Sequence, residues 1–312
     1  MSTREGSLEA PDRQPLDWKN PEFYDEDLLN QELERAFDIC HGCRRCVSLC
    51  DSFPTLFDLI DESDTFEVDG VDKADYTKVV DQCFLCDLCA ETKCPYVPPH
   101  EWMLDFPHLM LRAKAVKFRK QDTKWRDRII TSTDPIFDAI STPGIAQLAN
   151  AAAGSKTLRK AGEALFGLHQ DAPLPYFHAT PTSKKLPGEV GADHPAQSTD
   201  RTTGKVAIYL TCYGDHNEPQ MVEDLVAVLA HNQIPVKLLQ DAKCCGMPKL
   251  ELGDLKKVEK MKDANVPVFL DAIAEGYDII APIPSCVLMY KQELPLMFPD
   301  SEEVANIQKH FF

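Results

Sequence analysis

The spacing of apolar residues gives the first part of the chain a helical pattern. Residues 25–39 place apolar side chains near helical spacing behind an acidic first turn, which predicts a helix. Its apolar positions are Leu28, Leu29, Leu33 and Phe37. Residues 100–130 also have a helical pattern. The acidic stretch 58–75 has few apolar residues, so we expect a surface excursion with little core.

From residue 205 the pattern changes to short apolar runs separated by amphipathic segments. The runs at 205–212, 235–239 and 277–286 predict buried strands. Segments 218–232 and 254–275 predict the helices between them. The expected apolar face of the first of these helices is Met221, Leu225, Val228 and Leu229. Strand–helix alternation predicts a small parallel α/β unit. Residues 171–204, rich in Pro, Thr, Ser and Gly, read as a linker.

The chain contains twelve cysteines, and their distribution adds chemistry to this pattern. They occupy positions 40, 43, 46, 50, 83, 86, 89, 94, 212, 244, 245 and 286. None lies between 95 and 211, which indicates two cysteine-bearing modules and a connector. Because the N-terminus lacks the apolar segment of a secretory signal, this number of cysteines favours metal or redox chemistry over structural disulfides.

The first eight cysteines form two runs with the spacing of iron–sulfur ligands. Each run has three cysteines at x2 spacing and a fourth beyond them. In two-cluster ferredoxins the fourth cysteine ligates the other cluster. The first predicted [4Fe–4S] site is therefore Cys40, Cys43, Cys46 and Cys94. The second is Cys83, Cys86, Cys89 and Cys50. A structural zinc site would need paired Cys-x2-Cys knuckles, not cysteine triplets.

The runs depart from the usual ferredoxin pattern in two places. Asp51 follows Cys50 where a proline is usual, and the second run has x4 spacing before its last cysteine. These changes affect the path of the loops more than the ligands. His41, Arg44 and Arg45 lie inside the first loop, either facing solvent or placing positive charge near a cluster, which would raise its potential.

The last four cysteines follow the three predicted strands. Cys212 ends the first strand, Cys244 and Cys245 follow the second, and Cys286 follows the third. In a parallel sheet these positions share the carboxyl edge, where α/β sheets build their sites. Adjacent cysteines rarely bridge each other. We therefore predict one metal centre, with Gly246 allowing close approach of the backbone.

The motif Cys212, Cys244-Cys245-Gly246 and Cys286 resembles the cysteine-rich CCG domain. The order of a two-cluster ferredoxin module and a CCG module is similar to that of iron–sulfur subunits of anaerobic glycerol-3-phosphate dehydrogenase and glycolate oxidase. Heterodisulfide reductase subunits carry the same domain. The resemblance implies electron transfer between a flavoprotein dehydrogenase and a quinone or thiol acceptor. It also implies a third iron–sulfur centre.

Two departures limit what the resemblance implies. Met289 stands where the family motif has its last cysteine, and a thioether is a weak ligand. A four-cysteine iron–sulfur centre or zinc therefore fits the CCG site better than the special non-cubane cluster. The family usually has two CCG repeats and this chain has one, so the chain resembles a short form or a fragment.

The expected fold is α+β overall, in four parts. Residues 1–25 form a flexible N-terminus, and 26–112 form an α-helical domain with two [4Fe–4S] clusters. Residues 113–203 form a helical connector and linker, and 204–312 form a small α/β parallel-sheet CCG domain.

The net charge of −17 argues against a nucleic-acid partner. No apolar run reaches the roughly 18 residues of a membrane span. A cytoplasmic location follows, with peripheral association at the inner face of the membrane as the alternative. The basic segment 112–128 either lies on a membrane surface or packs on the acidic first module.

The leading functional interpretation is an electron-transfer subunit of an oxidoreductase, whose substrate is converted by a flavoprotein partner. No Gly-rich nucleotide motif follows a strand, and no catalytic residue is assigned. One alternative is a catalytic thiol–disulfide or heterodisulfide reductase that uses the CCG centre. Another is a redox or iron sensor that binds a regulator.

Overall fold

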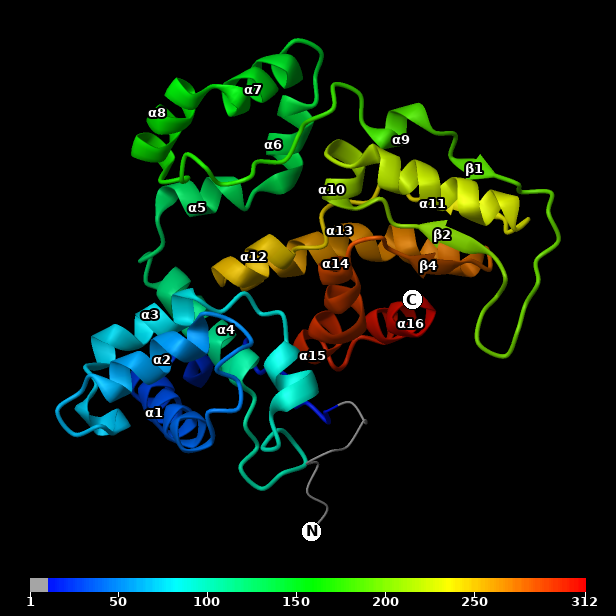
Figure 1. The fold of residues 1–312 in the computed structure, drawn as a ribbon. Helices are drawn as coiled ribbons and strands as arrows, with labels where there is room; N and C mark the ends of the chain where they lie inside the picture. The colour runs from blue at the N-terminus through cyan, green and yellow to red at the C-terminus, as the bar shows by residue number, and fades with distance from the viewer. Residues whose placement is uncertain (1–10) are drawn as a thin grey trace. The chain divides into compact units, whose positions relative to one another are not determined.

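A computed structural model describes residues 11–312, which divide into two compact units (Figure 1). Unit 1 contains the described residues up to Thr123, with the short segments Lys249–Leu255 and Leu296–Phe298. Unit 2 contains Lys124–Pro248, Lys256–Pro295 and Pro299–Phe312. Over residues 11–312, no helix has the length and apolar character needed to cross a membrane.

Unit 1 is built from helices. They are α1 (Glu26–Cys43), α2 (Ser52–Asp61), α3 (Tyr76–Asp81) and α4 (Phe106–Arg119), with 3-10 turns at Pro21–Tyr24, Val68–Gly70 and Lys73–Asp75 and a π turn at Cys89–Lys93. The Asp25 side chain caps α1 by accepting the Leu28 N–H. Of the four apolar positions expected for this helix, Leu29, Leu33 and Phe37 are buried, whereas Leu28 is 42% exposed.

An aromatic cluster forms the centre of unit 1. Phe37 contacts Tyr76 edge-on at 5.0 Å between ring centroids, and Phe53 packs on Phe106 at 4.7 Å. The acidic stretch 58–75 is mostly exposed, as predicted, but it also contributes to this core. Its buried members are Ile60, Val68 and Val71.

The basic segment that follows the second cysteine run lies partly in helix α4, where two of its lysines form ion pairs. Lys117 pairs with Asp81 and Lys120 pairs with Glu26, each at 2.8 Å. The opposite face of the helix is buried in unit 1. For the part of this segment that lies in α4, the expectation that it packs on the acidic first module is confirmed. The domain boundary expected after residue 112 falls inside α4, and the helix continues across it.

The described part of the N-terminal segment, which begins at residue 11, packs on unit 1. Arg13, Leu16 and Trp18 are buried in unit 1. The Trp18 indole N–H donates to the Met297 carbonyl at 3.0 Å, and its ring contacts Phe298 edge-on. Burial of these three side chains and the indole hydrogen bond offset part of the chain entropy that the segment loses. Residues 1–10 lie outside the described part of the chain.

Unit 2 contains a small sheet and the remaining helices. Its first part holds α5 (Trp125–Ile130), α6 (Thr133–Ile140), α7 (Ile145–Gly154), α8 (Lys156–Phe166), α9 (Thr182–Lys185) and strand β1 (Glu189–Val190). Then follow β2 (Val206–Ile208), α10 (Thr211–His216), α11 (Pro219–His231), β3 (Val236–Leu238), α13 (Leu255–Ala274) and β4 (Asp278–Ile280). The chain ends with α14 (Pro284–Leu288), a π turn at Met289–Glu293, α15 (Leu294–Met297) and α16 (Glu302–His310). Helix α12 (Met247–Leu252) and α15 each contain a boundary between the units.

The sheet has the strand order β1-β3-β2-β4, in which β2 pairs in parallel with both β3 and β4. The predicted parallel arrangement of the three strands is confirmed. Strand β1 adds an antiparallel edge and lies in the segment expected to be a linker, so that segment is partly structured. Because the order reverses at β2, right-handed crossovers place α11 and α13 on opposite faces (Figure 1).

The two faces of the sheet pack on different helices, because successive side chains along β2 and just beyond it point to opposite faces. Ile208 packs in a cluster with Val222 and Val226 of α11, whereas Tyr209 contacts Phe269 of α13 at 5.2 Å. The apolar face expected for α11 was partly wrong, since Val228 is 59% exposed.

We predict that Trp18→Ala lowers the free energy of unfolding by about 3–5 kcal/mol, because it leaves a cavity and removes an indole hydrogen bond. Urea unfolding followed by circular dichroism measures the change. Trp125→Ala is the matched control, since Trp125 is 60% exposed, and its effect should stay within about 0.5 kcal/mol. Equal effects of the two substitutions would show that the N-terminal segment does not stabilise unit 1.

Candidate metal centres

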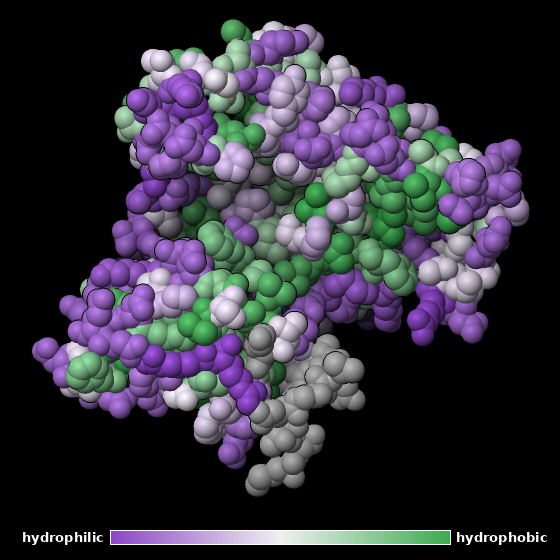
Figure 2. Space-filling view, viewed as in Figure 1, coloured by the Kyte–Doolittle hydropathy of each residue, from purple (hydrophilic) through white to green (hydrophobic). Residues whose placement is uncertain are grey.

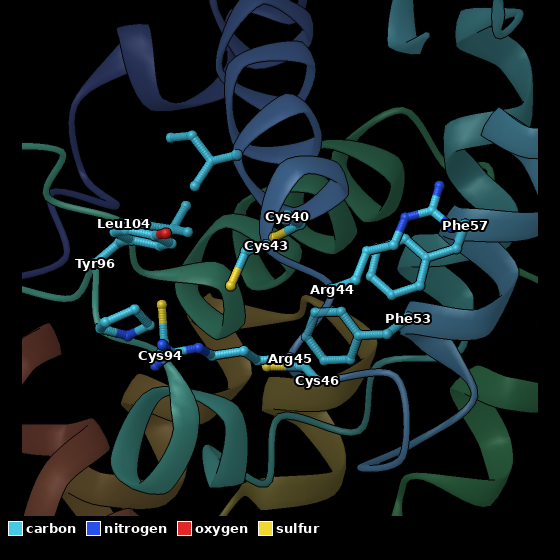
Figure 3. Close-up of a pocket in the computed structure, with 12 residues that line it drawn as sticks. Cys40, Cys43, Arg44, Arg45, Cys46, Phe53, Phe57, Cys94, Tyr96 and Leu104 are labelled. Carbon is cyan, nitrogen blue, oxygen red and sulfur yellow. The ribbon is translucent and has the colours of Figure 1, made fainter. Parts of the chain in front are cut away.

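The first predicted ligand set lines one cavity. Cys40, Cys43, Cys46 and Cys94 all border it, and Figure 3 shows these side chains around a common space. The other lining residues are mainly apolar and include Phe53, Phe57 and Leu104. The structure thus brings the fourth cysteine of the second run to the first three of the other run, as the crossed pairing requires.

The local backbone explains this convergence. Helix α1 ends where Arg44 adopts a left-handed conformation, with φ of 51°, and its N–H bonds to the Cys40 carbonyl. The chain therefore turns sharply between Cys43 and Cys46. Arg44 and Arg45 both border the cavity, and the Arg44 side chain also pairs with Asp61 and stacks on Phe57.

Electrostatics in the cavity favour a bound cationic centre. Burial, and then the neighbouring sulfurs, raise the pKa of Cys40, so four thiolates would not persist there without positive charge. Burial also raises the pKa of Cys94, although the N–H groups of Tyr96 and Val97 donate to its sulfur. Thiolate ligands, amide donors and a dry wall together fit an iron–sulfur cluster.

The second set also gathers in unit 1. Burial raises the pKa of Cys83 to about 11, and the nearby sulfurs of Cys50 and Cys86 add to the shift. The N–H of Leu85 donates to the Cys83 sulfur. Cys86 is exposed, whereas Cys50 and Cys89 are partly buried.

The two sets are adjacent through Cys89. Burial raises the pKa of Cys89, and the next causes are the sulfurs of Cys83 in its own set and Cys46 in the other. Cys94 contributes as well. Within residues 11–312, no three Cys, His, Asp or Glu side chains are placed to hold a single metal ion.

The four remaining cysteines lie beyond the carboxyl ends of the parallel strands. Cys212 is in α10 after β2, Cys244 and Cys245 follow β3, and Cys286 is in α14 after β4. The Sγ atoms of Cys212 and Cys244 are 3.9 Å apart. Hydrogen bonds connect Cys245 with Cys244 and Cys286. The structure therefore brings all four together, as predicted.

The pKa values of Cys212, Cys244 and Cys245 differ from one another. A hydrogen bond from Cys212 lowers the pKa of Cys244 well below its usual value, with further donation from Cys245 and from the Gly246 N–H. Gly246 has φ of +95°, and a Cβ there would meet only ordinary contacts. The glycine is therefore needed for its backbone conformation, not for the close approach that we expected. Met289 is fully buried.

A single buried amide holds the loop that carries the adjacent cysteines. The Asn265 Oδ1 accepts the Lys243 N–H at 2.6 Å, and its Nδ2 donates to the carbonyls of Lys243 and Cys244 at 3.0 and 3.2 Å. The same nitrogen lies 2.8 Å from the Tyr290 hydroxyl. Tyr209 also donates to the Lys243 carbonyl, at 2.5 Å. This loop has no strand partner, so side chains satisfy its buried backbone groups.

The connector supplies a further contact to this loop. Asp134 of α6 accepts the Cys244 N–H at 2.9 Å. Burial, and then the charge of Cys244, raise the pKa of Asp134 to about 6. No site residue was expected in the connector, and Asn265 was not expected to support the site either. Of these two residues, only Asn265 could have been noticed in the sequence, because it is a polar residue within the apolar stripe of α13. The stripe consists of Leu255, Val258, Met261, Phe269 and Ala272.

Comparison with known proteins supports the prediction that unit 2 contains a cysteine-rich domain. Residues 206–291 match the family model of the cysteine-rich domain CCG. The resemblance read from the cysteine motif is thereby confirmed for this part of the chain. No solved structure matches the chain significantly.

Several curated proteins are similar to the chain. A subunit of the anaerobic glycerol-3-phosphate dehydrogenase of Escherichia coli (strain K12) is 29% identical over 188 residues, which cover 60% of this chain and 45% of that protein. Citrate utilization protein B of Escherichia coli is 29% identical over 28% of this chain and 21% of its own length. Lactate utilization protein A 1 of Bacillus mycoides (strain KBAB4) is 29% identical over 31% of this chain and 38% of its own length.

The matched region spans less than half the length of each of these relatives. Together with the CCG domain, the matches are consistent with an iron–sulfur subunit of an oxidoreductase.

We predict that Cys50→Ser damages the centre held by Cys83, Cys86 and Cys89, because the fourth ligand comes from the other run. Iron analysis and EPR of the reduced protein should show loss of one cluster and retention of the other. Cys212→Ser is the control and should leave both signals in place. Loss confined to the centre of Cys40, Cys43 and Cys46 would contradict the crossed pairing.

We predict that Asn265→Leu exposes Cys244 and Cys245 to alkylation, because the loop loses the amide that fixes it. Each backbone group left unpaired should cost about 1–3 kcal/mol. Mass spectrometry after brief alkylation of the native protein measures the effect. Asn232→Leu, which removes a hydrogen bond only to the Val228 carbonyl at the end of α11, is the control. Unchanged reactivity of both cysteines in the Asn265 variant would contradict the clamp.

Proposed function

We propose that this chain is an electron-transfer subunit of an oxidoreductase complex. In this proposal it takes electrons from a flavoprotein dehydrogenase and delivers them to a quinone or thiol acceptor. The observation that carries the proposal is the pair of adjacent four-cysteine sets in unit 1, linked through the surroundings of Cys89. Two neighbouring four-cysteine sets suit the passage of electrons between clusters better than a structural metal site.

The residues of unit 1 suit two [4Fe–4S] clusters. The first would be held by Cys40, Cys43, Cys46 and Cys94, and the second by Cys83, Cys86, Cys89 and Cys50. A cluster of this kind gains and loses one electron when bound. The apolar wall of Phe53, Phe57 and Leu104 limits water at the first site.

Amide donors and nearby cations would adjust the potentials. The N–H groups that reach Cys83 and Cys94 stabilise negative charge on sulfur. Arg45 at the first cavity and Lys114, whose ammonium donates to the Cys83 carbonyl, add positive charge on either side. Both effects favour the more negative, reduced state and so raise the potential.

The four cysteines of unit 2 form the third proposed centre, containing either iron–sulfur or zinc. Cys212, Cys244, Cys245 and Cys286 supply the sulfurs, and the clamp of Asn265 keeps the paired cysteines in place. Cysteines used as metal ligands, as we propose for all twelve here, suit a reducing compartment. We therefore propose a cytoplasmic protein, with peripheral association at the inner face of the membrane as the alternative.

The similarity to a subunit of anaerobic glycerol-3-phosphate dehydrogenase supports a partner that converts the substrate. No residue of this chain is proposed to act on an organic substrate. The dehydrogenase partner, its flavin and the terminal acceptor all belong to this proposal.

A second candidate is a thiol–disulfide reductase that uses the CCG centre. It is favoured by the 3.9 Å separation of the Cys212 and Cys244 sulfurs, since two thiols at this distance need little movement to form a disulfide. In that reaction the two thiols would lose two electrons and two protons to a substrate disulfide, which would leave as two thiols.

We predict that the reduced protein transfers electrons to menadione, a water-soluble quinone, and does not reduce glutathione disulfide. Reduced methyl viologen serves as the donor, and both acceptors are assayed without oxygen. Cys50→Ser should slow the quinone reaction. Reduction of glutathione disulfide that is abolished by Cys244→Ser would instead favour the thiol–disulfide reductase.

A further inference from the structure

The loop of the second ligand set alternates between buried and exposed side chains. Cys83, Leu85 and Asp87 are 7%, 3% and 2% exposed. The residues between them, Phe84 and Cys86, are exposed, as is Leu88 after Asp87. Positive φ angles at Leu85 and Asp87 shape this extended path. Residues 84, 86 and 88 therefore lie along the outer side of one loop.

The inner side of this loop is firmly anchored. The Arg13 guanidinium lies 2.5 Å from the Asp87 carboxylate and 2.8 Å from that of Asp105, and both Arg13 and Asp87 are buried. The Lys114 ammonium donates to the Cys83 carbonyl. Exposure of the outer residues is therefore a property of a fixed backbone, not of a loose segment.

Two large apolar side chains flank the exposed cysteine. Phe84 is 63% exposed and Leu88 is 49% exposed. Of the twelve cysteines, all of which the structure describes, Cys86 alone is exposed. Apolar side chains placed around an exposed ligand position suit a contact with another molecule better than contact with water.

The surrounding sequence is acidic. Residues 50–94 contain twelve Asp and Glu against three Lys. Two of these lysines are in ion pairs, Lys73 with Glu34 and Lys78 with Asp75. Over helices α1–α3 the surface seen in Figure 2 is largely hydrophilic and is interrupted by apolar residues. An apolar patch in an acidic field is complementary to a partner with a basic rim.

We propose that Phe84 and Leu88, on either side of Cys86, form the docking surface for an electron-carrying protein with a basic rim. This inference rests on the proposed electron-transfer function and assigns its protein contact to the second ligand set. The apolar pair provides the contact, and the acidic residues steer the partner to it. One electron passes per encounter: the protein that donates it is oxidised by one electron, and the protein that accepts it is reduced by one. With ferricytochrome c as the probe, this chain is the donor.

The test uses horse cytochrome c, a basic haem protein, as the probe. Binding of ferricytochrome c is measured by isothermal titration calorimetry at low salt. The protein is then reduced with dithionite and desalted without oxygen, and the rate of haem reduction is followed. We expect Phe84→Ser/Leu88→Ser to raise the dissociation constant and to lower the second-order rate constant about tenfold each. Added salt, or succinylation of the cytochrome lysines, should weaken binding to the unsubstituted protein.

Two controls separate docking from other effects. Phe66→Ser removes another exposed aromatic of unit 1, at 65% exposure, and should leave binding unchanged. Ferricyanide, a small acceptor, should be reduced at the same rate by all variants, and their EPR signals should match. If cytochrome c binds the double variant as tightly as the unsubstituted protein, the docking surface is wrong while electron transfer stands. If neither acceptor is reduced by the unsubstituted protein, the proposed function itself fails.

Discussion

The gathering of cysteine sulfurs in groups of four, most of them buried or partly buried, is the constraint on which the rest of this structure depends. Sulfurs held together away from water resist becoming thiolates, as the raised pKa values of Cys40 and Cys89 indicate. Such groups are stable when a cation and amide donors balance the charge. The loops must therefore be held rigidly from outside, by the aromatic core of unit 1 and by the amide of Asn265 in unit 2.

Much of this arrangement could be predicted because it is encoded by short-range spacing. The x2 spacings of the two runs and the position of each late cysteine after a strand indicated which sulfurs would meet. The cavity in unit 1 is lined by Cys40, Cys43, Cys46 and Cys94, which are the four cysteines predicted to form the first set. The parallel pairing of β2 with β3 and β4 was also predicted. What each set binds stays a proposal.

The features that sequence did not reveal are long-range contacts between single side chains. Asp134 reaches Cys244 from 110 positions away in the chain, and Arg13 pairs with Asp87 across 74 positions. Neither contact has a spacing that a pattern could detect, so no contact was predicted for residues 1–25. Asn265 was also missed, although the sequence carried a signal for it, because a polar residue in an apolar stripe needs a buried partner. Leu28 and Val228 were expected on the apolar faces of their helices but are exposed, because near-helical spacing alone does not identify which side of a helix is buried.

Two iron–sulfur clusters in unit 1 are the central proposal for this protein. Iron and acid-labile sulfide analysis of the chain purified without oxygen, combined with EPR of the reduced sample, tests it most directly. We expect about eight irons and about eight sulfides attributable to the first eight cysteines, with magnetic coupling between two neighbouring clusters. A colourless protein that contains zinc and no iron, even after reconstitution with ferrous iron and sulfide, would contradict the proposal.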